Sequence, residues 1–357
     1  MDNMSIEKIL NITEKEYRSL SYDSYSSIKD FISSRLKYYK KYILKEKGKD
    51  DDTKEQDSDD MRFGNIVDCL KFTPDDFESR YQISSAEIPD SPQMIKFVKE
   101  LIKLCIINTN DMGVLCGNLE LLIEEAYNNT GIKQTKIDAW KEKFLIKKEG
   151  YDYFLELKDR KDRIIISPAE LEWAQSIKDY MTNHPHVRDI MNCSSNDDYE
   201  VFDQIMLKGV INDVEVKMMG DRVILNKKKK LITPFDLKVM SNIEMFPYNY
   251  LKLKYYVQNG VYTTLLRQNF PEYEIPPIKF VTIDKYRQCE PTIVKTSEKQ
   301  YQQAMNGFSI NGRKYKGVNE ALEEMKWHKE KGIWTSPKEI IDNNGFIDLI
   351  LDNVDSE

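Results

Sequence analysis

Residues 220–239, GDRVILNKKKKLITPFDLKV, predict two β-strands joined by a lysine-rich turn. Short β-branched runs lie on both sides of NKKKK at 226–230, which is typical of a hairpin. Asp236 and Lys238 are two residues apart, so both side chains point to the same face of their strand. Fifteen residues separate Asp221 from Asp236, a spacing with which the hairpin would bring both carboxylates to one place.

Two neighbouring carboxylates are unfavourable without a cation, and their hard oxygen atoms suit Mg²⁺, with Mn²⁺ as a substitute. A lysine beside them can orient or help to deprotonate an attacking water, and hydrolysis of nucleic-acid phosphodiesters needs these elements. The spacing alone is also compatible with surface aspartates, one of them paired with Lys238. Asp221, Asp236 and Lys238 are therefore candidate catalytic residues.

The segments around the hairpin predict an α/β fold. A helix is expected over 24–47, with N-cap candidates at Ser24–Ser27 and a basic face that is either solvated or in contact with DNA. Periodicity predicts further helices and strands at the following positions. The helices are expected at 92–108, 115–128, 168–182, 248–267 and 316–331, and the strands at 201–207, 214–218, 278–285 and 291–295.

The bulk composition is that of an ordinary folded protein, with 357 residues, 40% hydrophobic and 32% charged. The net charge of -7 is not typical of a non-specific nucleic-acid binder, but residues 48–60 hold seven acids against two lysines and predict an acidic linker or loop. Five isolated cysteines argue against a disulfide scaffold, a zinc ribbon and an iron–sulfur cluster. Without a membrane-length apolar run or a secretory segment, a cytoplasmic protein is expected, in the host cytoplasm if the chain is phage-encoded.

Segments on both sides of the hairpin resemble, in the same order, those of the PD-(D/E)xK nuclease superfamily. Within it, the closest resemblance is to the RecE-like (exonuclease VIII) group of phage and prophage exonucleases. VEVKMMGDRVIL at 214–225 resembles the strand with the first metal-binding aspartate, and PFDLKV is the D-x-K motif. The other matching segments are SYDSYSSIKDFISSRLKYY, MRFGNIVDCLKFTPDDFESRY at 61–81, HPHVRDIMN at 184–192, YEVF at 199–202 and the closing ALEEMKWHKEKGIW.

The resemblance implies a restriction-endonuclease-like core, with a central mixed sheet flanked by helices and a helical N-terminal part. It implies that Asp221, Asp236 and the Leu237 carbonyl hold the metal and that Lys238 positions the water. Gln258 and Tyr262 form a Q-x-x-x-Y motif on one face of the following helix. The resemblance places them beside the active site, along the substrate path, in contact with the DNA or with the catalytic groups. The domains implied are a helical element at 1–47, the linker at 48–60, a nuclease domain at 61–345 and a tail at 346–357.

This chain departs from the family pattern at one position. Related nucleases carry a metal-binding histidine four residues after a helical glycine, whereas here Asp68 follows Gly64. Aspartate is an oxygen donor suited to Mg²⁺, so we hypothesise that Asp68 takes the place of the histidine; the alternative is a plain surface aspartate. Glu200 is a further candidate metal ligand or a solvent-exposed acid, and Lys217 is a candidate phosphate contact.

The function implied by the resemblance is Mg²⁺-dependent digestion of linear duplex DNA in the 5′→3′ direction. The implied setting is phage-type recombination, with a single-strand annealing protein as partner and a ring-like homo-oligomer around DNA. Two alternatives stay open. One is a RecB-type nuclease directed to single strands or flaps, and the other is a catalytically degenerate fold retained as a DNA-binding module.

Overall fold

The structure, a computed structural model, describes residues 9–46, 59–86, 89–108, 119–132, 135–159 and 163–346. The chain forms two compact units, one of residues 1–73 with 175–357 and one of residues 74–174. The predicted linker lies outside the described residues except for Asp59 and Asp60, which begin a helix. The predicted tail after Phe346 also lies outside the described residues.

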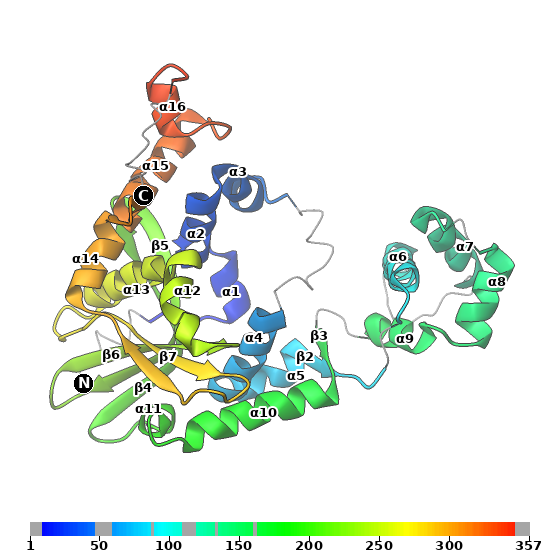
Figure 1. The fold of residues 1–357 in the computed structure, drawn as a ribbon, viewed down its shortest axis with the longest axis horizontal. Helices are drawn as coiled ribbons and strands as arrows, with labels where there is room; N and C mark the ends of the chain where they lie inside the picture. Colours follow the sequence, from blue (N-terminus) through cyan, green and yellow to red (C-terminus); the bar gives the residue numbers. More distant parts are fainter. Residues whose placement is uncertain are drawn as a thin grey trace, which may run out of the picture. The chain divides into compact units, whose positions relative to one another are not determined.

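A six-stranded mixed sheet forms the centre of the larger unit (Figure 1). Strands β4, β5 and β6 follow one another antiparallel, β7 runs parallel to β6, β8 runs antiparallel to β7, and the short β1 pairs in parallel with β5. This central sheet with flanking helices confirms the predicted α/β class. The strands are β1 (Asp23–Ser24), β4 (Tyr199–Ile211), β5 (Val214–Asn226), β6 (Leu231–Met240), β7 (Lys279–Asp284) and β8 (Thr292–Lys295).

Two tight turns connect the antiparallel strands. Asn212 and Asp213 join β4 to β5 with φ angles of 50° and 61°, as a two-residue hairpin turn with two left-handed positions requires. The predicted lysine-rich turn joins β5 to β6 and ends at Lys230, whose φ is 47°. The hairpin of residues 220–239 is therefore confirmed, and its register pairs Arg222 with Phe235 and Asn226 with Leu231.

Helices cover both faces of the sheet. Helix α13 (Tyr255–Asn269) buries Val257 and Val261 in the core that it shares with β4 and β5. Helix α4 (Asp59–Phe72) packs on the opposite face, where a Cβ on Gly64 would lie 4.0 Å from that of Val239. A single helix over 248–267 was expected, but the chain forms α12 (Phe246–Lys252) and α13 because Lys254 takes a left-handed conformation with φ 58°.

The predicted helix over 24–47 is also divided. Ser24 caps α2 (Tyr25–Ser33) through its side chain, as its position predicted. Ser34 then returns to an extended backbone and caps α3 (Arg35–Tyr38), which continues as the π-helix η2 (Tyr39–Ile43). The other helical segments of this unit are α1 (Glu14–Ser19), α10 (Pro168–Asn183), α11 (Arg188–Met191), η5 (Ile243–Met245), α14 (Glu298–Asn306), α15 (Val318–Lys331) and α16 (Lys338–Asp342). A small hairpin is formed by β9 (Phe308–Ile310) and β10 (Arg313–Tyr315).

Residues 74–174 form a compact unit of their own, whereas the sequence analysis expected one domain over 61–345. A helical core explains the difference, since Phe97, Trp140, Phe144 and Phe154 bury their rings together there. The unit contains a parallel pair of strands, β2 (Tyr81–Ile83) and β3 (Ile164–Ile166). Its helical segments are η3 (Pro74–Asp76), α5 (Phe77–Arg80), α6 (Pro92–Asn108), α7 (Leu119–Thr130), α8 (Ile137–Lys141), η4 (Glu142–Ile146) and α9 (Tyr151–Asp159), and α10 leaves it at residue 174.

Among the described helices of both units, none combines the length and the apolar character needed to cross a membrane.

The side chain of Lys217 is buried in the larger unit, where it binds backbone carbonyl groups. Its side chain is 6% exposed on β5, and its Nζ donates to the carbonyl oxygens of Tyr17 and Leu20, each at 2.7 Å. These carbonyls lie at the C-terminal end of α1, where a positive charge is favourable. The expected phosphate contact of Lys217 has no support in this geometry, because its donors are directed to the backbone.

Replacing Lys217 by alanine should lower the free energy of unfolding by about 2–3 kcal/mol, since buried carbonyls lose a charged donor. Urea denaturation measures this change. Lys208→Ala is the matched control, because Lys208 lies directly opposite on β4 and is exposed, and its removal should cost less than about 0.5 kcal/mol. A Lys217→Ala protein of unchanged stability but reduced DNA affinity would instead support the phosphate contact.

Candidate active site

The candidate site lies where strands β5 and β6 separate. The last residue pair between the two strands is Arg222 with Phe235, and Asp221 and Asp236 are the next residues beyond this pair. At that point the Leu237 N–H donates to Asp221 Oδ2 at 2.8 Å, so a side chain takes the place of the next backbone acceptor. The structure thereby brings the two predicted aspartates to neighbouring positions on adjacent strands.

Asp236 is the most enclosed member of the site. It is 2% exposed, its Oδ2 forms an ion pair with Lys238 Nζ, and its Oδ1 accepts a hydrogen bond from Gln258 Nε2. Gln258 comes from α13 and is itself buried. The predicted Gln258 therefore belongs to the site, and of its two expected contacts, with the DNA or with the catalytic groups, the structure shows the second, to the carboxylate of Asp236.

Lys238 lies between the carboxylates and an aromatic wall. Its Nζ is 4.9 Å from the centre of the Tyr255 ring, and Tyr25 lies close enough for the lysine charge to act on its hydroxyl. Burial alone would lower the pKa of Lys238, but the negative charges of Asp236 and Asp221 outweigh it and raise the pKa. The lysine is therefore a fixed positive charge and a hydrogen-bond donor.

The surroundings favour the charged form of Lys238 but disfavour the charged form of Asp221. Burial raises the pKa of Asp221 well above its usual value, and the nearby carboxylates of Asp236 and Asp68 raise it further. Lys238 and the Leu237 N–H oppose this effect only in part. The site thus holds more negative charge than its single lysine compensates.

Asp68 reaches the site from α4, as its influence on the pKa of Asp221 shows. Its Oδ2 accepts a hydrogen bond from Gln204 Nε2 at 3.1 Å. Gln204 lies opposite Asp221 on β4 and has a φ of 52°, a conformation that is uncommon for residues other than glycine. The sequence analysis did not find Gln204, because neither its residue type nor its spacing marks it.

Tyr262 also lies near the carboxylates. Burial raises the pKa of Tyr262 well above its usual value, with smaller contributions from Tyr17, Asp236 and Asp221. Its hydroxyl therefore keeps its proton at neutral pH. The Q-x-x-x-Y motif is in this way part of the site through both of its members.

Glu200 lies apart from this group. It pairs with Leu225, four residues along β5 from Asp221, which corresponds to a separation of about 13 Å along a strand. The expectation that Glu200 binds the catalytic metal is therefore not supported by its position. Lys217 and Glu200 are thus the two predicted site residues that the structure keeps away from Asp221, Asp236 and Lys238.

The donor set fits a divalent cation. The buried Asp236 Oδ2 has Lys238 Nζ as its ion-pair partner, and the carboxylates of Asp221 and Asp68 beside it add further hard oxygen donors. Asp221, Asp236 and the Leu237 carbonyl would hold the ion, with Asp68 as a further donor. The ligand atoms of Asp68, Asp221 and Asp236 do not all lie within 4.8 Å of one another, so side-chain rotation would have to complete such a shell.

Comparison with known proteins agrees with this site. Residues 24–327 match the sequence model of the family described as "PDDEXK-like domain of unknown function". The chain belongs to this family. Membership confirms the PD-(D/E)xK superfamily that the ordered segments around the hairpin resemble, and it indicates a nuclease that uses a divalent metal. The RecE-like subgroup stays a prediction.

A solved structure described as a "Putative exonuclease" from Eubacterium rectale is similar over 95% of this chain and 89% of its own, with 13% identity and a TM-score of 0.44. No curated protein matches the sequence. The family match therefore carries the assignment of the PDDEXK-like domain.

Without divalent metal, Asp221→Asn should raise the thermal midpoint at neutral pH. The raised pKa means that the folded state binds this proton more tightly than the unfolded chain does. Stability is therefore lost as pH rises from the ordinary aspartate range towards the raised pKa, and the neutral amide removes that loss. Melting curves in EDTA at acidic and neutral pH measure the effect, with exposed Asp75→Asn as control. An equal or lower midpoint at neutral pH would contradict it.

Asp68→Ala tests the departure from the family pattern. If Asp68 replaces the usual histidine, the variant should lose about 10- to 100-fold in Mg²⁺ affinity or cutting rate. Mg²⁺ titrations of DNA cleavage measure both quantities, and Asp75→Ala should behave as the wild type. Full Mg²⁺ affinity with full cutting rate would remove Asp68 from the site.

Proposed function

We propose that this chain is a Mg²⁺-dependent DNA exonuclease that digests linear duplex DNA in the 5′→3′ direction during phage-type recombination. The observation that carries the nuclease assignment is the group of Asp221, Asp236 and Lys238 at the split between two strands, with Gln258 fixing Asp236. The resemblance to RecE-like exonucleases supports the polarity and the duplex substrate. It also supports a single-strand annealing partner and a homo-oligomer.

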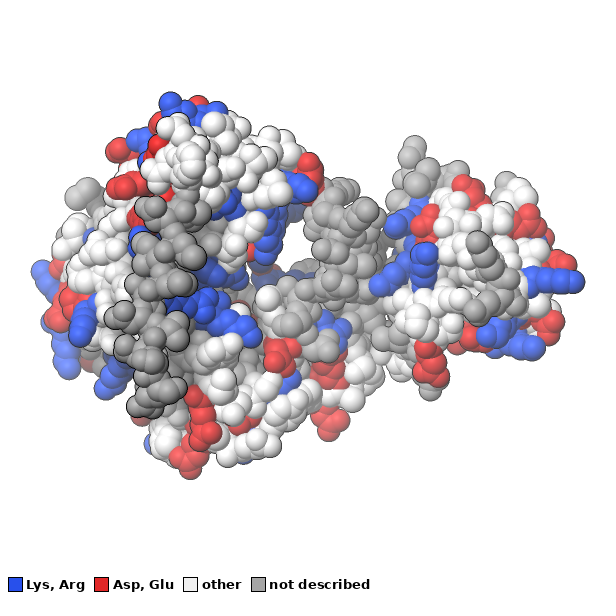
Figure 2. Space-filling view, turned by 45° about the horizontal axis from the view of Figure 1, so that its top comes forward, with Lys and Arg blue, Asp and Glu red and all other residues white. Residues whose placement is uncertain are grey.

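A basic surface beside the site suits a phosphate backbone. Lys29 Nζ lies 5.2 Å from the centre of the Tyr25 ring, and it is close enough to Lys37, Lys41 and Lys238 for their charges to lower its pKa, after the larger effect of burial. Asp30 pairs with Lys37 and Lys41 and fixes them in place. In Figure 2, Lys and Arg side chains gather in the middle of the larger unit, and others lie at its edge among acidic groups.

These charges explain how a chain of net charge -7 can bind DNA. Lysines around the site neutralise phosphates locally, and the affinity that they provide falls as salt rises. The basic face of the segment at 24–47, which the sequence left open between a solvated face and a DNA contact, lies on the same side as Lys238. This position favours the DNA contact.

The chemistry follows from the charges of the site. A bound divalent cation would supply charge neutralisation at the phosphate and activation of a water molecule. Lys238, held as an ammonium ion, would orient that water and donate to a phosphate oxygen as negative charge develops there. Gln258 would keep Asp236 in its ligating orientation, and the Tyr255 ring would shield Lys238 from solvent.

Digestion of end-labelled linear duplex with Mg²⁺ tests the proposal. Wild-type protein should release label from the 5′ end before the 3′ end, and Asp236→Ala should release neither. Lys238→Ala should cut about 10²- to 10⁴-fold more slowly and bind DNA nearly as well, since it loses water positioning and charge stabilisation. Lys208→Ala, an exposed lysine on β4, is the matched control.

Each other outcome has a defined meaning. Preferential cutting of single strands or flaps would favour the RecB-type alternative. DNA binding without any Mg²⁺-dependent release would favour the degenerate module. Unimpaired digestion by Lys238→Ala would overturn the mechanism.

A further inference from the structure

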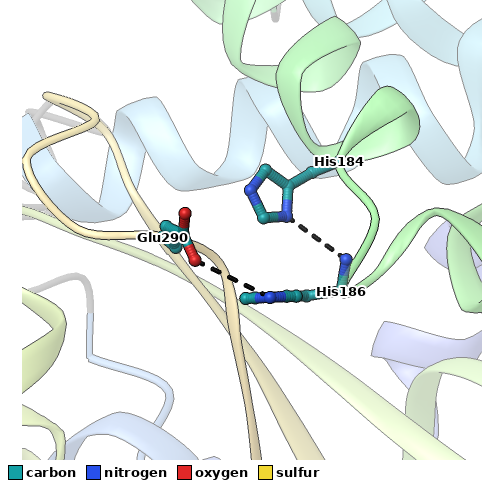
Figure 3. A group of neighbouring side chains, drawn as sticks. All are labelled: His184, His186 and Glu290. Carbon is teal, nitrogen blue, oxygen red and sulfur yellow. Dashed lines mark hydrogen bonds and ion pairs between the residues drawn. The ribbon is translucent and has the colours of Figure 1, made fainter.

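Two histidines and a glutamate meet away from the candidate active site. His184 and His186 flank Pro185 in the connection between α10 and α11, and Glu290 lies in the connection between β7 and β8 (Figure 3). One ligand atom from each of the three side chains lies within 4.8 Å of the other two. In the part of the chain that the structure describes, this is the one group of three His, Cys, Asp or Glu residues that meets this spacing.

The hydrogen bonds of His186 fix which of its nitrogens is free to bind an ion. Its Nδ1 lies 3.1 Å from the carbonyl oxygen of Pro291, and because a carbonyl only accepts, Nδ1 carries the proton. The neutral ring then directs the lone pair of Nε2 at Glu290 Oε2, 3.6 Å away. Two facing acceptors repel each other unless a proton or a metal cation lies between them.

An outer hydrogen bond from Nδ1 to a carbonyl is the usual way in which proteins orient a histidine that binds metal through Nε2. His184 Nδ1 accepts the N–H of His186 at 3.3 Å, so its lone pair is engaged in the free protein and would bind an ion in place of that hydrogen bond. The His184 ring is held by Tyr180, with ring centres 5.3 Å apart, and Arg287 lies over Tyr180 at 5.2 Å. These contacts restrict the orientation of both imidazoles.

The surroundings leave room for an ion to enter. His184, Tyr180 and Arg287 line a cavity of about 520 Å³. The His184 side chain is partly exposed and those of His186 and Glu290 are exposed, so an ion can reach the three side chains from solvent.

We propose that His184, His186 and Glu290 bind a transition-metal ion of the Zn²⁺ class. Two imidazoles and one carboxylate are a typical Zn²⁺ ligand set that leaves a fourth position open, whereas the oxygen-only active site suits Mg²⁺. The ion would join the α10–α11 connection to the β7–β8 connection and so stabilise the edge of the sheet. The proposal does not depend on the nuclease assignment.

Isothermal titration of the full chain with Zn²⁺, in excess Mg²⁺ to occupy the active site, tests the proposal. Wild-type protein should bind one equivalent that His186→Ala lacks. Glu290→Gln should bind it at least about tenfold more weakly, by analogy with the loss of an outer ligand partner. Glu339→Gln, an exposed glutamate on α16, and Cys289→Ser should bind it as the wild type does.

A second readout separates binding from misfolding. Zn²⁺ should raise the thermal midpoint of the wild type and of both controls, raise that of Glu290→Gln less, and leave that of His186→Ala unchanged. Without metal, the midpoints of both variants should match the wild type. Equal Zn²⁺ stoichiometry and affinity in the wild type, His186→Ala and Glu290→Gln would overturn the proposal. So would loss of the equivalent in Cys289→Ser alone. No bound Zn²⁺ in any protein would likewise overturn the proposal.

Discussion

The hydrogen bond from the Leu237 N–H to the Asp221 carboxylate marks the point on which the site depends. Ladder pairing between β5 and β6 stops there, and a side chain satisfies the backbone donor that the splitting strands would otherwise leave unpaired. Residues from both faces of the sheet can then approach the same place. Gln258 arrives from α13 on one face and Asp68 from α4 on the other.

The charge balance of the site follows from this arrangement. Asp221, Asp236 and Asp68 face one fixed ammonium group, that of Lys238, in surroundings that exclude most water. Such a group costs stability in the folded protein, and a divalent cation removes that cost when it binds. Such a group of acids is unfavourable for stability but suits metal-dependent chemistry, as expected for a member of the PDDEXK-like family.

The elements around the site have distinct structural roles. Lys217 fixes α1 against β5 and Ser24 caps α2, and these contacts hold Tyr25 and Lys29 beside Lys238. The helical unit of residues 74–174 has its own apolar core and supplies no residue to the group of Asp221, Asp236 and Lys238.

The sequence by itself determined the hairpin of residues 220–239, because strand periodicity and a lysine-rich turn are local properties. With them came the shared face of Asp236 and Lys238, and the order of the neighbouring motifs identified the superfamily. Only the tertiary structure decided which residues complete the site. Gln204, Tyr25 and Tyr255 carry no local signal, while Glu200 and Lys217 had plausible types but lie on the wrong part of their strands. Strand register and helix packing set these positions, and both depend on contacts between residues far apart in the chain.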